Sequence, residues 1–412
     1  MTDHYDALET RDPAAREEVF FARLPDFLRM ATEKAPGWAE QLSGADLTDV
    51  RDRAALARLP ILRKSDLMAR QAAHPPLGGY ATKEPGHLNR LFMSPGPIYD
   101  CDGSDRDWWL VARALFAAGI REGDIVHNCF AYHLTPAGHM FETGAQALGC
   151  AVIPAGTGNT EMQIDAIAHL KPAAYSGTPD YLKILLDAAE AAGKDASSIK
   201  RALVSGGALF PSMREDYANR GVHVRQCYGT ADLGIVAYES QAMEGMIVSE
   251  DMIVEIVTPG TGDPVAPGDV GEIVVTSLNS DYPMIRFATG DMSAVMEGTS
   301  PCGRTNMRIK GWMGRADQRV KVKGMFVDPA QIAAVARRHP QLGRVRLVVT
   351  RDGDRDAMTL KAEVGVVPDG FAASVAGTLR AETKLGGEIA FVEPGSLPND
   401  GQVIADERDY DA

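Results

Sequence analysis

A carboxylate that could bind hydroxyl groups follows a short apolar strand near the end of the chain. The segment DYPMIRFATGDMSAV starts at residue 281, and Met284, Ile285 and Phe287 are the apolar part of a predicted strand that stops at Thr289–Gly290. Glycine lets the backbone turn at residue 290, so the side chain of Asp291 is expected at the mouth of this strand. A carboxylate in that position can accept two hydroxyl hydrogen bonds.

A polar break lies a little further along the chain. Residues 314–317 read GRAD, and they precede the alternating run VKVK at residues 320–323, which predicts a strand that ends at Gly324. A polar joint between two well-patterned strands is typical of a swivel between two domains. We therefore predict one domain over residues 1–316 and a second, mobile domain over residues 317–412.

Length and charge narrow the class of protein. A chain of 412 residues is too long for one ordinary core, so two domains or more are expected. Hydrophobic residues make up 45% and charged residues 24%, which is typical of a water-soluble globular protein. The formal net charge of −14 argues against nucleic acid or an anionic membrane as the main partner.

The termini and cysteines point to the cytoplasm. The start of the sequence, MTDHYDALETRD, is acidic and polar, unlike a signal or transit peptide. No run approaches the roughly 20 apolar residues that cross a bilayer. The cysteines are scattered and odd in number, which favours reduced thiols over a disulfide framework. They are Cys101, Cys129, Cys150, Cys227 and Cys302.

Residues 107–240 alternate between helix and strand patterns, which predicts a parallel sheet covered by helices. Ligands bind such sheets beyond the carboxyl ends of the strands. The candidate ligand loops are therefore Tyr132–His133, Gly156–Thr160, Thr178–Pro179, Ser205–Ala208 and Tyr228–Asp232. Short alternating segments in residues 241–280 predict a small β-barrel-like unit. The predicted fold is α/β, with a small α+β domain at the end of the chain.

Several of these segments together resemble phenylacetate-CoA ligases, a branch of the adenylate-forming superfamily. The resemblance is carried by TGD at 289–291, by GRAD at 314–317 and by YGTADLG from residue 228. It is also carried by AYHLTPAG and the following GNTEMQ, and these segments occur in the family's order over nearly the whole chain. The resemblance implies a carboxylic acid–CoA ligase that forms an acyl-adenylate and then a thioester.

The resemblance also implies roles for individual residues. Asp291 would hold the ATP ribose with support from Arg315, Tyr228 would stack on adenine, Asp232 would meet magnesium, and Asp317 would be the hinge. Further cofactor-binding positions are Ser205, Gly206, Gly207, Gly229, Thr230 and Lys323. The acyl pocket would include Tyr132, His133, Ala208 and Cys227. The implied cofactors are ATP or AMP, Mg²⁺ and coenzyme A, and the other substrate is an aryl or acyl acid.

Two parts of the catalytic machinery depart from the family pattern. The phosphate loop is replaced by MSPGPIYDCDG at 93–103, which has two prolines, one serine, no lysine and two carboxylates that would repel a triphosphate. Gln402 stands where the family has its catalytic lysine, and an amide offers no positive charge to a developing oxyanion. Ala231 replaces a hydroxyl residue. Lys321 or Lys323 is the candidate substitute for the missing lysine.

Three functions therefore remain open on sequence alone. They are an acid–CoA ligase, a departed relative that binds or acts on a preformed CoA thioester, and a non-catalytic regulatory binder. His133 is interpreted as a pocket wall or gate rather than a general base, since a base needs a partner. Cys302 lacks the companions that a zinc site requires. A homodimer is the oligomer to expect first.

Overall fold

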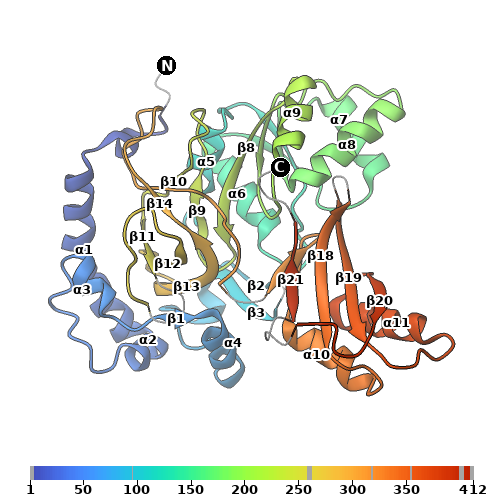
Figure 1. The fold of residues 1–412 in the computed structure, drawn as a ribbon. Coiled ribbons are helices and arrows are strands. Elements are labelled where there is room, and N and C mark those ends of the chain that lie inside the picture. The colour runs from blue at the N-terminus through green and yellow to red at the C-terminus, as the bar shows by residue number, and fades with distance from the viewer. Residues whose placement is uncertain are drawn as a thin grey trace. The chain divides into compact units, whose positions relative to one another are not determined.

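The structure is a computed structural model, and it describes residues 4–94, 96–257, 262–316, 319–352, 355–398 and 403–408 (Figure 1). The described chain divides into two compact units. The first holds the residues up to Leu209 and those from Arg214 to Ala316, and the second holds Phe210–Met213 and residues 317–412.

A nine-stranded sheet forms the centre of the first unit, in the order β14-β15-β10-β9-β8-β7-β6-β4-β5. The five strands from β5 to β8 run parallel, and β9, β10, β15 and β14 extend the sheet by antiparallel pairing. The strand bounds are β4 Ile125–Asn128, β5 Ala151–Pro154, β6 Ala174–Gly177, β7 Arg201–Val204, β8 His223–Thr230, β9 Gly234–Tyr238, β10 Met246–Val248, β14 Val295–Met296 and β15 Arg308–Ile309.

Helices α6 to α9 connect the parallel strands, because a parallel pair needs a crossover between its strands, and α5 precedes β4 (Figure 1). Their bounds are α5 Val111–Ala117, α6 Ala137–Leu148, α7 Thr160–Leu170, α8 Pro179–Ala191 and α9 Pro211–Asn219. Helices α5 and α6 pack closely at Gly144, where an added Cβ would come within 2.4 Å of the Val111 side chain. The core of this layer is apolar, with Leu182, Leu185 and Leu203 fully buried.

A second, four-stranded sheet in the order β1-β13-β12-β11 lies in the same unit. Its strands are β1 Leu62–Arg63, β11 Met252–Val257, β12 Gly271–Ser277 and β13 Met284–Ser293. Strands β11, β12 and β13 are antiparallel, and β1 joins β13 in parallel. The barrel-like unit expected from the sequence is thus a sheet with β1 and β11 at its two edges. The hairpin of β2 (Arg90–Ser94) and β3 (Ile98–Asp102) pairs separately.

The first helices of the chain form because their apolar residues recur at helical spacing behind a cap. Helix α1 (Pro13–Lys34) starts after Asp12, whose carboxylate accepts a hydrogen bond from the backbone N–H of Ala15 at 3.0 Å. Phe20, Leu24 and Leu28 then bury one face. The short elements that follow are α2 Pro36–Gln41, α3 Arg53–Ala57, α4 Lys64–Ala73 and the 3₁₀ turns Ala7–Thr10 and Pro85–His87.

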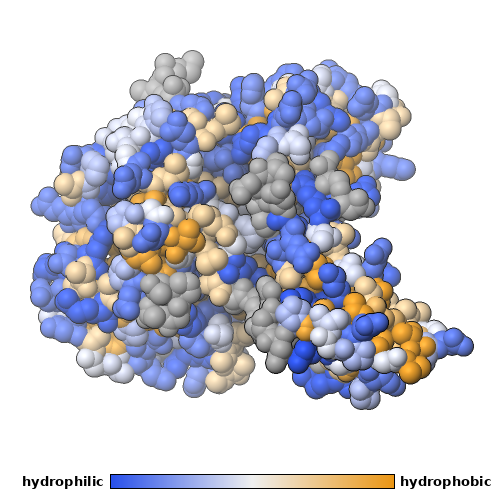
Figure 2. All heavy atoms as spheres, viewed as in Figure 1, coloured by the Kyte–Doolittle hydropathy of each residue, from blue (hydrophilic) through white to orange (hydrophobic). Residues whose placement is uncertain are grey.

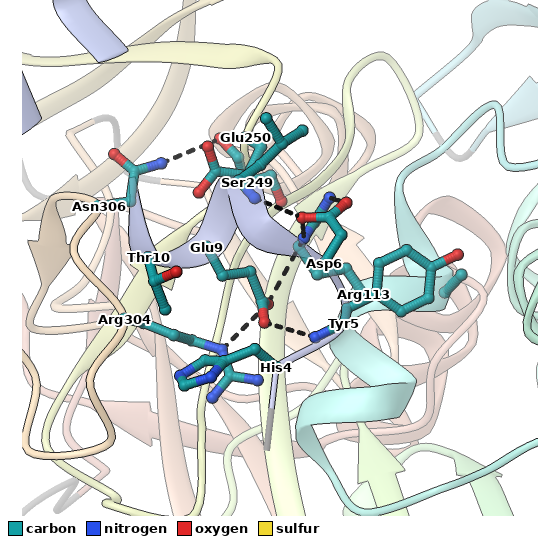
Figure 3. A network of polar contacts seen from close by, with 12 residues as sticks. His4, Tyr5, Asp6, Glu9, Thr10, Arg113, Ser249, Glu250, Arg304 and Asn306 are labelled. Atoms are coloured by element: carbon teal, nitrogen blue, oxygen red, sulfur yellow. Dashed lines mark hydrogen bonds and ion pairs between the residues drawn. The ribbon is translucent and has the colours of Figure 1, made fainter. Parts of the chain in front are cut away.

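A buried polar network connects the start of the chain to the segment Ser300–Arg304 (Figure 3). Glu9 is buried and forms a 3.0 Å ion pair with the fully buried Arg304, while the backbone N–H of Tyr5 donates to its other oxygen at 2.8 Å. Arg113 binds both oxygens of Asp6, at 2.9 and 2.7 Å. This segment is therefore held by charge-assisted hydrogen bonds, which are stronger than neutral ones.

The second unit is a small α+β fold with its own core. A four-stranded sheet in the order β20-β19-β18-β21 carries helices α10 and α11 (Figure 1). Apolar side chains from both layers form the core, among them Leu347, Leu360, Val375 and Leu379. The bounds are β16 Val320–Val322, β17 Met325–Val327, α10 Pro329–Arg338, β18 Val345–Asp352, β19 Arg355–Glu363, α11 Phe371–Thr383, β20 Glu388–Val392 and β21 Ile404–Asp406.

The surface is consistent with the charge of the sequence. On the face shown in Figure 2, hydrophilic residues predominate and apolar residues are interspersed among them. None of the helices in the described residues is long and apolar enough to cross a membrane.

Candidate nucleotide and acyl site

Four of the five predicted ligand loops follow parallel strands of the nine-stranded sheet, and the fifth, Tyr228–Asp232, begins within β8. Side-chain hydrogen bonds tie several of them together. The Ser205 hydroxyl, just after β7, donates to the carbonyl oxygen of Cys227 on β8 at 2.9 Å. The amide of Gln163 donates to the carbonyl oxygens of Gly156 and Gly158, at 3.0 and 2.7 Å. The sheet thus brings the predicted loops to one edge, as its parallel topology requires.

Asp291 is the most extensively hydrogen-bonded of the predicted site residues. Its Oδ1 accepts from Arg315 Nη1 at 2.8 Å and from Trp312 Nε1 at 3.0 Å. Its Oδ2 accepts from the hydroxyl of Tyr228 at 2.9 Å. A carboxylate offers about four acceptor positions, so three protein donors leave room for one more. The residues predicted to hold a nucleoside, Asp291, Arg315 and Tyr228, are therefore in mutual contact.

The backbone around Asp291 differs from the sequence prediction. Strand β13 does not end at Thr289–Gly290 but runs on to Ser293, so Asp291 lies within the strand. The pairing with β12 is interrupted there, because Ala288 pairs with Val274 and Met292 with Glu272. The three residues between them form a bulge in which Gly290 has φ +75°. This bulge, rather than a strand end, turns Asp291 toward Arg315, with which it makes an isolated bridge.

Burial and charge shape the chemistry of Tyr228. The residue is only 8% exposed, and burial together with the charge of Asp291 raises the pKa of its hydroxyl well above the usual range. The phenol therefore stays protonated and donates to Asp291. On the same strand, Gly229 leaves no room for a side chain, since an added Cβ would come within 2.5 Å of the Gly234 carbonyl oxygen. The Thr230 hydroxyl accepts from the backbone N–H of Leu233 at 3.2 Å.

Asp232, the predicted magnesium ligand, lies in a buried charged cluster. Its side chain is fully buried, and its Oδ2 accepts from Lys64 Nζ at 2.9 Å. Its Oδ1 is buried and receives no hydrogen bond from the described residues. A buried carboxylate oxygen without a donor fits a hard divalent cation, so the residue suits the predicted metal on this oxygen. Lys64 occupies the other oxygen.

The segment in place of a phosphate loop is the β2–β3 hairpin, and it directs a second carboxylate inward. Asp100 on β3 is 1% exposed, and its Oδ2 accepts from the Ser94 hydroxyl at 2.9 Å. Burial and the charge of Asp232 raise the pKa of Asp100 well above its usual range, while Lys64 acts in the opposite direction. The hairpin thus lacks a lysine and has instead a buried carboxyl group, whose pKa is affected by the charges of Asp232 and Lys64.

The predicted acyl-pocket residues lie after β4. The amide of Asn128 donates to the Tyr132 hydroxyl at 2.7 Å. The Tyr132 ring meets His139 edge-on at 5.1 Å, and His139 lies 5.6 Å from the ring of Phe92. Burial raises the pKa of Tyr132, so it stays a neutral hydroxyl. His133 is exposed, and no hydrogen bond to its ring is found in the described chain.

The loop after β7 turns tightly, and the thiol of the neighbouring Cys227 is not reactive. Gly206 has φ +77°, a conformation that favours glycine, and Gly207 lies close to Pro179. Ala208 is partly buried. Cys227 is buried and burial raises its thiol pKa to about 12, so it is a wall residue rather than a nucleophile.

The remaining predicted residues lie away from the loops described above or outside the described residues. Lys323 is exposed in the tight β16–β17 turn of the second unit, with φ +48°, and its backbone N–H donates to Asp356 at 3.0 Å. The catalytic position Gln402 and the hinge Asp317 lie outside the described residues, so both remain predictions. Cys302 is partly buried, and His4 Nε2 lies 3.1 Å from its carbonyl oxygen. No cluster of three or more metal-binding side chains is found in the described chain.

Three residues in the site were missed from sequence. Lys64 pairs with Asp232 across 168 positions, and nothing local to its helix marks it. Trp312 lies three residues before Arg315. The predicted association of the Asp291 and Arg315 segments could therefore have indicated it. Asn128 is the last residue of β4, where a buried amide is a signal for a polar contact.

Comparison with known proteins decides the family. A family model described as AMP-binding enzyme matches residues 110–279. The phenylacetate-coenzyme A ligase of Aromatoleum evansii is 30% identical over 378 residues, which cover 87% of this chain and 84% of that protein. This chain belongs to the phenylacetate-coenzyme A ligase family. The ligase of Thermus thermophilus is also 30% identical, over 83% of this chain and 80% of that protein.

Solved structures agree with this membership. A 2-hydroxyisobutyryl-CoA ligase, solved with 2-HIB-AMP and CoA in the thioesterification state, has a TM-score of 0.86 and 25% identity. The match covers 98% of this chain and 92% of that chain. The predicted family, the α/β fold class and the acid–thiol ligase class are confirmed. The predicted non-catalytic binder is disfavoured by the same findings.

Proposed function

We propose that this chain joins a small carboxylic acid to coenzyme A through an acyl-adenylate made from ATP. One acid oxygen attacks the α-phosphorus of ATP, and the bond to pyrophosphate breaks. The thiol sulfur of coenzyme A then attacks the acyl carbon, AMP leaves, and the thiol loses its proton. Family membership supports this reaction, since relatives at 30% identity are named phenylacetate-coenzyme A ligases.

The observation that carries the proposal is the environment of Asp291. Three donors from Tyr228, Trp312 and Arg315 orient its carboxylate as an acceptor with one position left for a ligand hydroxyl. A ribose hydroxyl donates to such a group, and the neighbouring Tyr228 ring offers an apolar face to adenine. The related 2-hydroxyisobutyryl-CoA ligase holds an acyl-AMP and CoA, which is the pair of ligands proposed here.

The remaining roles follow from position. Asp232 would hold Mg²⁺ through its unpartnered oxygen, and Mg²⁺ when bound would neutralise charge on the phosphates. The Ser205–Ala208 loop and Thr230 would border the adenylate. Tyr132 and its aromatic neighbours would border the acyl group, and an aromatic pocket favours an aryl acid over a straight chain. Phenylacetate is the first acid to try. Rotation about Asp317 between the two half-reactions is part of the same proposal.

The test is acid-dependent release of pyrophosphate from ATP and Mg²⁺, followed by detection of the CoA thioester by mass spectrometry. Phenylacetate, benzoate and 2-hydroxyisobutyrate form the acid panel. At least one acid should release pyrophosphate above the no-acid control, and the same acid should yield a thioester. No pyrophosphate with any acid, together with undetectable binding of AMP, would contradict the proposal.

A second candidate function is favoured by one observation, the buried Asp100 carboxylate where the family has its phosphate loop. In this alternative the chain acts on a preformed CoA thioester or acyl-adenylate and does not use ATP. Ligand binding distinguishes the two functions. The alternative predicts tight binding of a thioester and no binding of ATP–Mg²⁺ by titration calorimetry, whereas the ligase binds both ATP–Mg²⁺ and coenzyme A.

A further inference from the structure

The β2–β3 hairpin and the turn after β8 together build a buried acidic cluster. Asp100 is 1% exposed and the Asp232 side chain is fully buried. Lys64 Nζ lies 2.9 Å from Asp232 Oδ2, and the Ser94 hydroxyl lies 2.9 Å from Asp100 Oδ2. Each carboxylate is therefore fixed by one protein donor on one of its two oxygens.

The cluster holds two carboxyl groups and one ammonium group. Other charged groups nearby are already paired, since Asp102 binds Arg90 at 2.5 Å and Asp281 binds Lys83 at 2.6 Å. The cation that acts on Asp100 is thus Lys64, and it already serves Asp232. An unbalanced buried carboxylate is costly, so the cluster favours the arrival of another positive charge.

The two remaining carboxylate oxygens lack any donor. Asp100 Oδ1 and Asp232 Oδ1 are both buried, and none of the described residues donates a hydrogen bond to either. Asp102 Oδ1 also lacks a donor, on a carboxylate whose other oxygen binds Arg90. Nearly all buried polar atoms in proteins have a partner, so the orphaned oxygens of Asp100 and Asp232 indicate a missing ligand. Oxygen atoms of this kind are the ligands that magnesium prefers.

The number of carboxylates indicates how such a cation would be held. No group of three or more metal-binding side chains exists in the described part of the chain, so the protein alone does not complete a metal site. Magnesium is commonly bound by one or two carboxylates, with phosphate oxygens and water as its other ligands. The cluster therefore suits a cation that arrives with a nucleotide rather than a resident one.

We propose that Asp100 is a second carboxylate ligand, beside Asp232, of the divalent cation that accompanies ATP. This inference rests on the proposed function and deepens it. Asp100 and Asp232 would hold the cation between the hairpin and the phosphates, so the hairpin binds phosphate without a lysine of its own. Lys64 then remains the protein's positive charge at this end of the site. The two hairpin carboxylates thereby have different roles. Asp100 would bind the cation, whereas Asp102 is paired with Arg90.

The test is the affinity for Mn²⁺ in the presence of ATP, measured by electron paramagnetic resonance of free and bound Mn²⁺. Asp100→Asn should weaken Mn²⁺ binding by about tenfold or more, since loss even of groups that only support a ligand costs about 10- to 100-fold. Asp232→Asn should act in the same direction. The matched control is Asp102→Asn, two residues along the same strand, which should change the affinity by less than about twofold because Arg90 already pairs with that carboxylate.

Unchanged or tighter Mn²⁺ binding by Asp100→Asn would overturn the inference, because removal of a merely repulsive charge strengthens binding of the complex. Equal losses in Asp100→Asn and Asp102→Asn would also overturn it. Thermal unfolding checks that each variant is folded, and Asp100→Ser serves as a second variant if the asparagine protein is not. The proposed function fails separately, when the wild-type chain releases no pyrophosphate. Pyrophosphate release by a wild type whose Asp100→Asn variant binds Mn²⁺ normally contradicts the second ligand alone.

Discussion

The two ends of the candidate nucleotide site differ in how completely their carboxylates are hydrogen-bonded. At the proposed sugar end, Asp291 accepts from Tyr228, Trp312 and Arg315. At the proposed phosphate end, Asp100 and Asp232 each keep one buried oxygen without a donor. The carboxylate at the first end is bound by three protein donors, whereas the second end has two buried carboxyl groups and one ammonium group. A family fold can therefore keep one half of its site intact while the other half changes its chemistry.

The largest effect is expected at the phosphate end, from Lys64→Met. The change leaves Asp232 buried without its counter-ion, and breaking a buried pair costs about 3 kcal/mol or more. The free energy of unfolding in urea measures this loss. Lys83→Met is the control, because Lys83 is 41% exposed and its pair with Asp281 contributes about 1 kcal/mol or less. Equally small losses of unfolding free energy in both variants would mean that the buried Lys64–Asp232 pair stabilises the fold no more than an exposed pair does.

At the sugar end, Asp291→Asn should weaken AMP binding by about 10- to 100-fold. Hydrogen bonds to a charged group contribute about 1.5–3 kcal/mol, and the amide removes that charge while keeping the shape. Titration calorimetry with AMP measures the change. Asp269→Asn, at an exposed turn residue, is the matched control and should bind AMP normally. An Asp291→Asn protein with wild-type affinity would show that this carboxylate does not contact the nucleotide.

Asp100 should make stability depend on pH in a direction opposite to that of an ion-paired aspartate. Its folded pKa is raised by burial and by Asp232, so the folded chain holds a proton that the unfolded chain releases above about pH 4. This contribution is fully present below the unfolded pKa and is lost as the pH rises through the folded pKa. Asp100→Asn should remove that slope and raise the unfolding free energy at pH 8 relative to pH 5. A difference from wild type that is the same at both pH values would contradict the raised pKa.

The smallest effect is expected from His133→Ala, which tests a residue at neither the sugar end nor the phosphate end of the candidate site. The ring is exposed and has no hydrogen-bond partner among the described residues, so it lacks the orienting contact of a general base. The rate of thioester formation should fall by about threefold or less, well below the roughly 100-fold typical of general-base loss. A hundredfold loss, with a pH profile that loses an ionisation near neutrality, would instead assign His133 as the base.

Elements with a strong local pattern could be predicted from the sequence. Within residues 107–240, where the sequence predicts alternating helices and strands, the structure has strands at Ala151–Pro154 and Arg201–Val204. Helix α5 begins only at Val111, because the Asp107 carboxylate accepts from the backbone N–H groups of Val111 and Ala112 and Leu110 adopts φ +59°. A side-chain cap of this kind depends on one local contact and leaves no periodic signal.

The site was predictable only where its residues form motifs. Asp291, Arg315 and Tyr228 lie in short recognisable segments, and the structure brings them together. The Lys64–Asp232 pair could not be foreseen, since 168 residues separate its members and the hydrophobic pattern around Lys64 is that of any helix start. The inward direction of Asp100 depends on the register of the β2–β3 hairpin, which pairs Asp100 with Phe92. Register is set by tertiary contacts more than by composition.

Acid-dependent exchange of labelled pyrophosphate into ATP tests the central claim most directly, because it reports the adenylation step without coenzyme A. We predict exchange by the wild-type chain with an aryl acid such as phenylacetate, and at least a tenfold slower exchange by Asp291→Asn under subsaturating ATP. No exchange above the acid-free background, with a chain that still binds a CoA thioester, would contradict ATP-driven ligation.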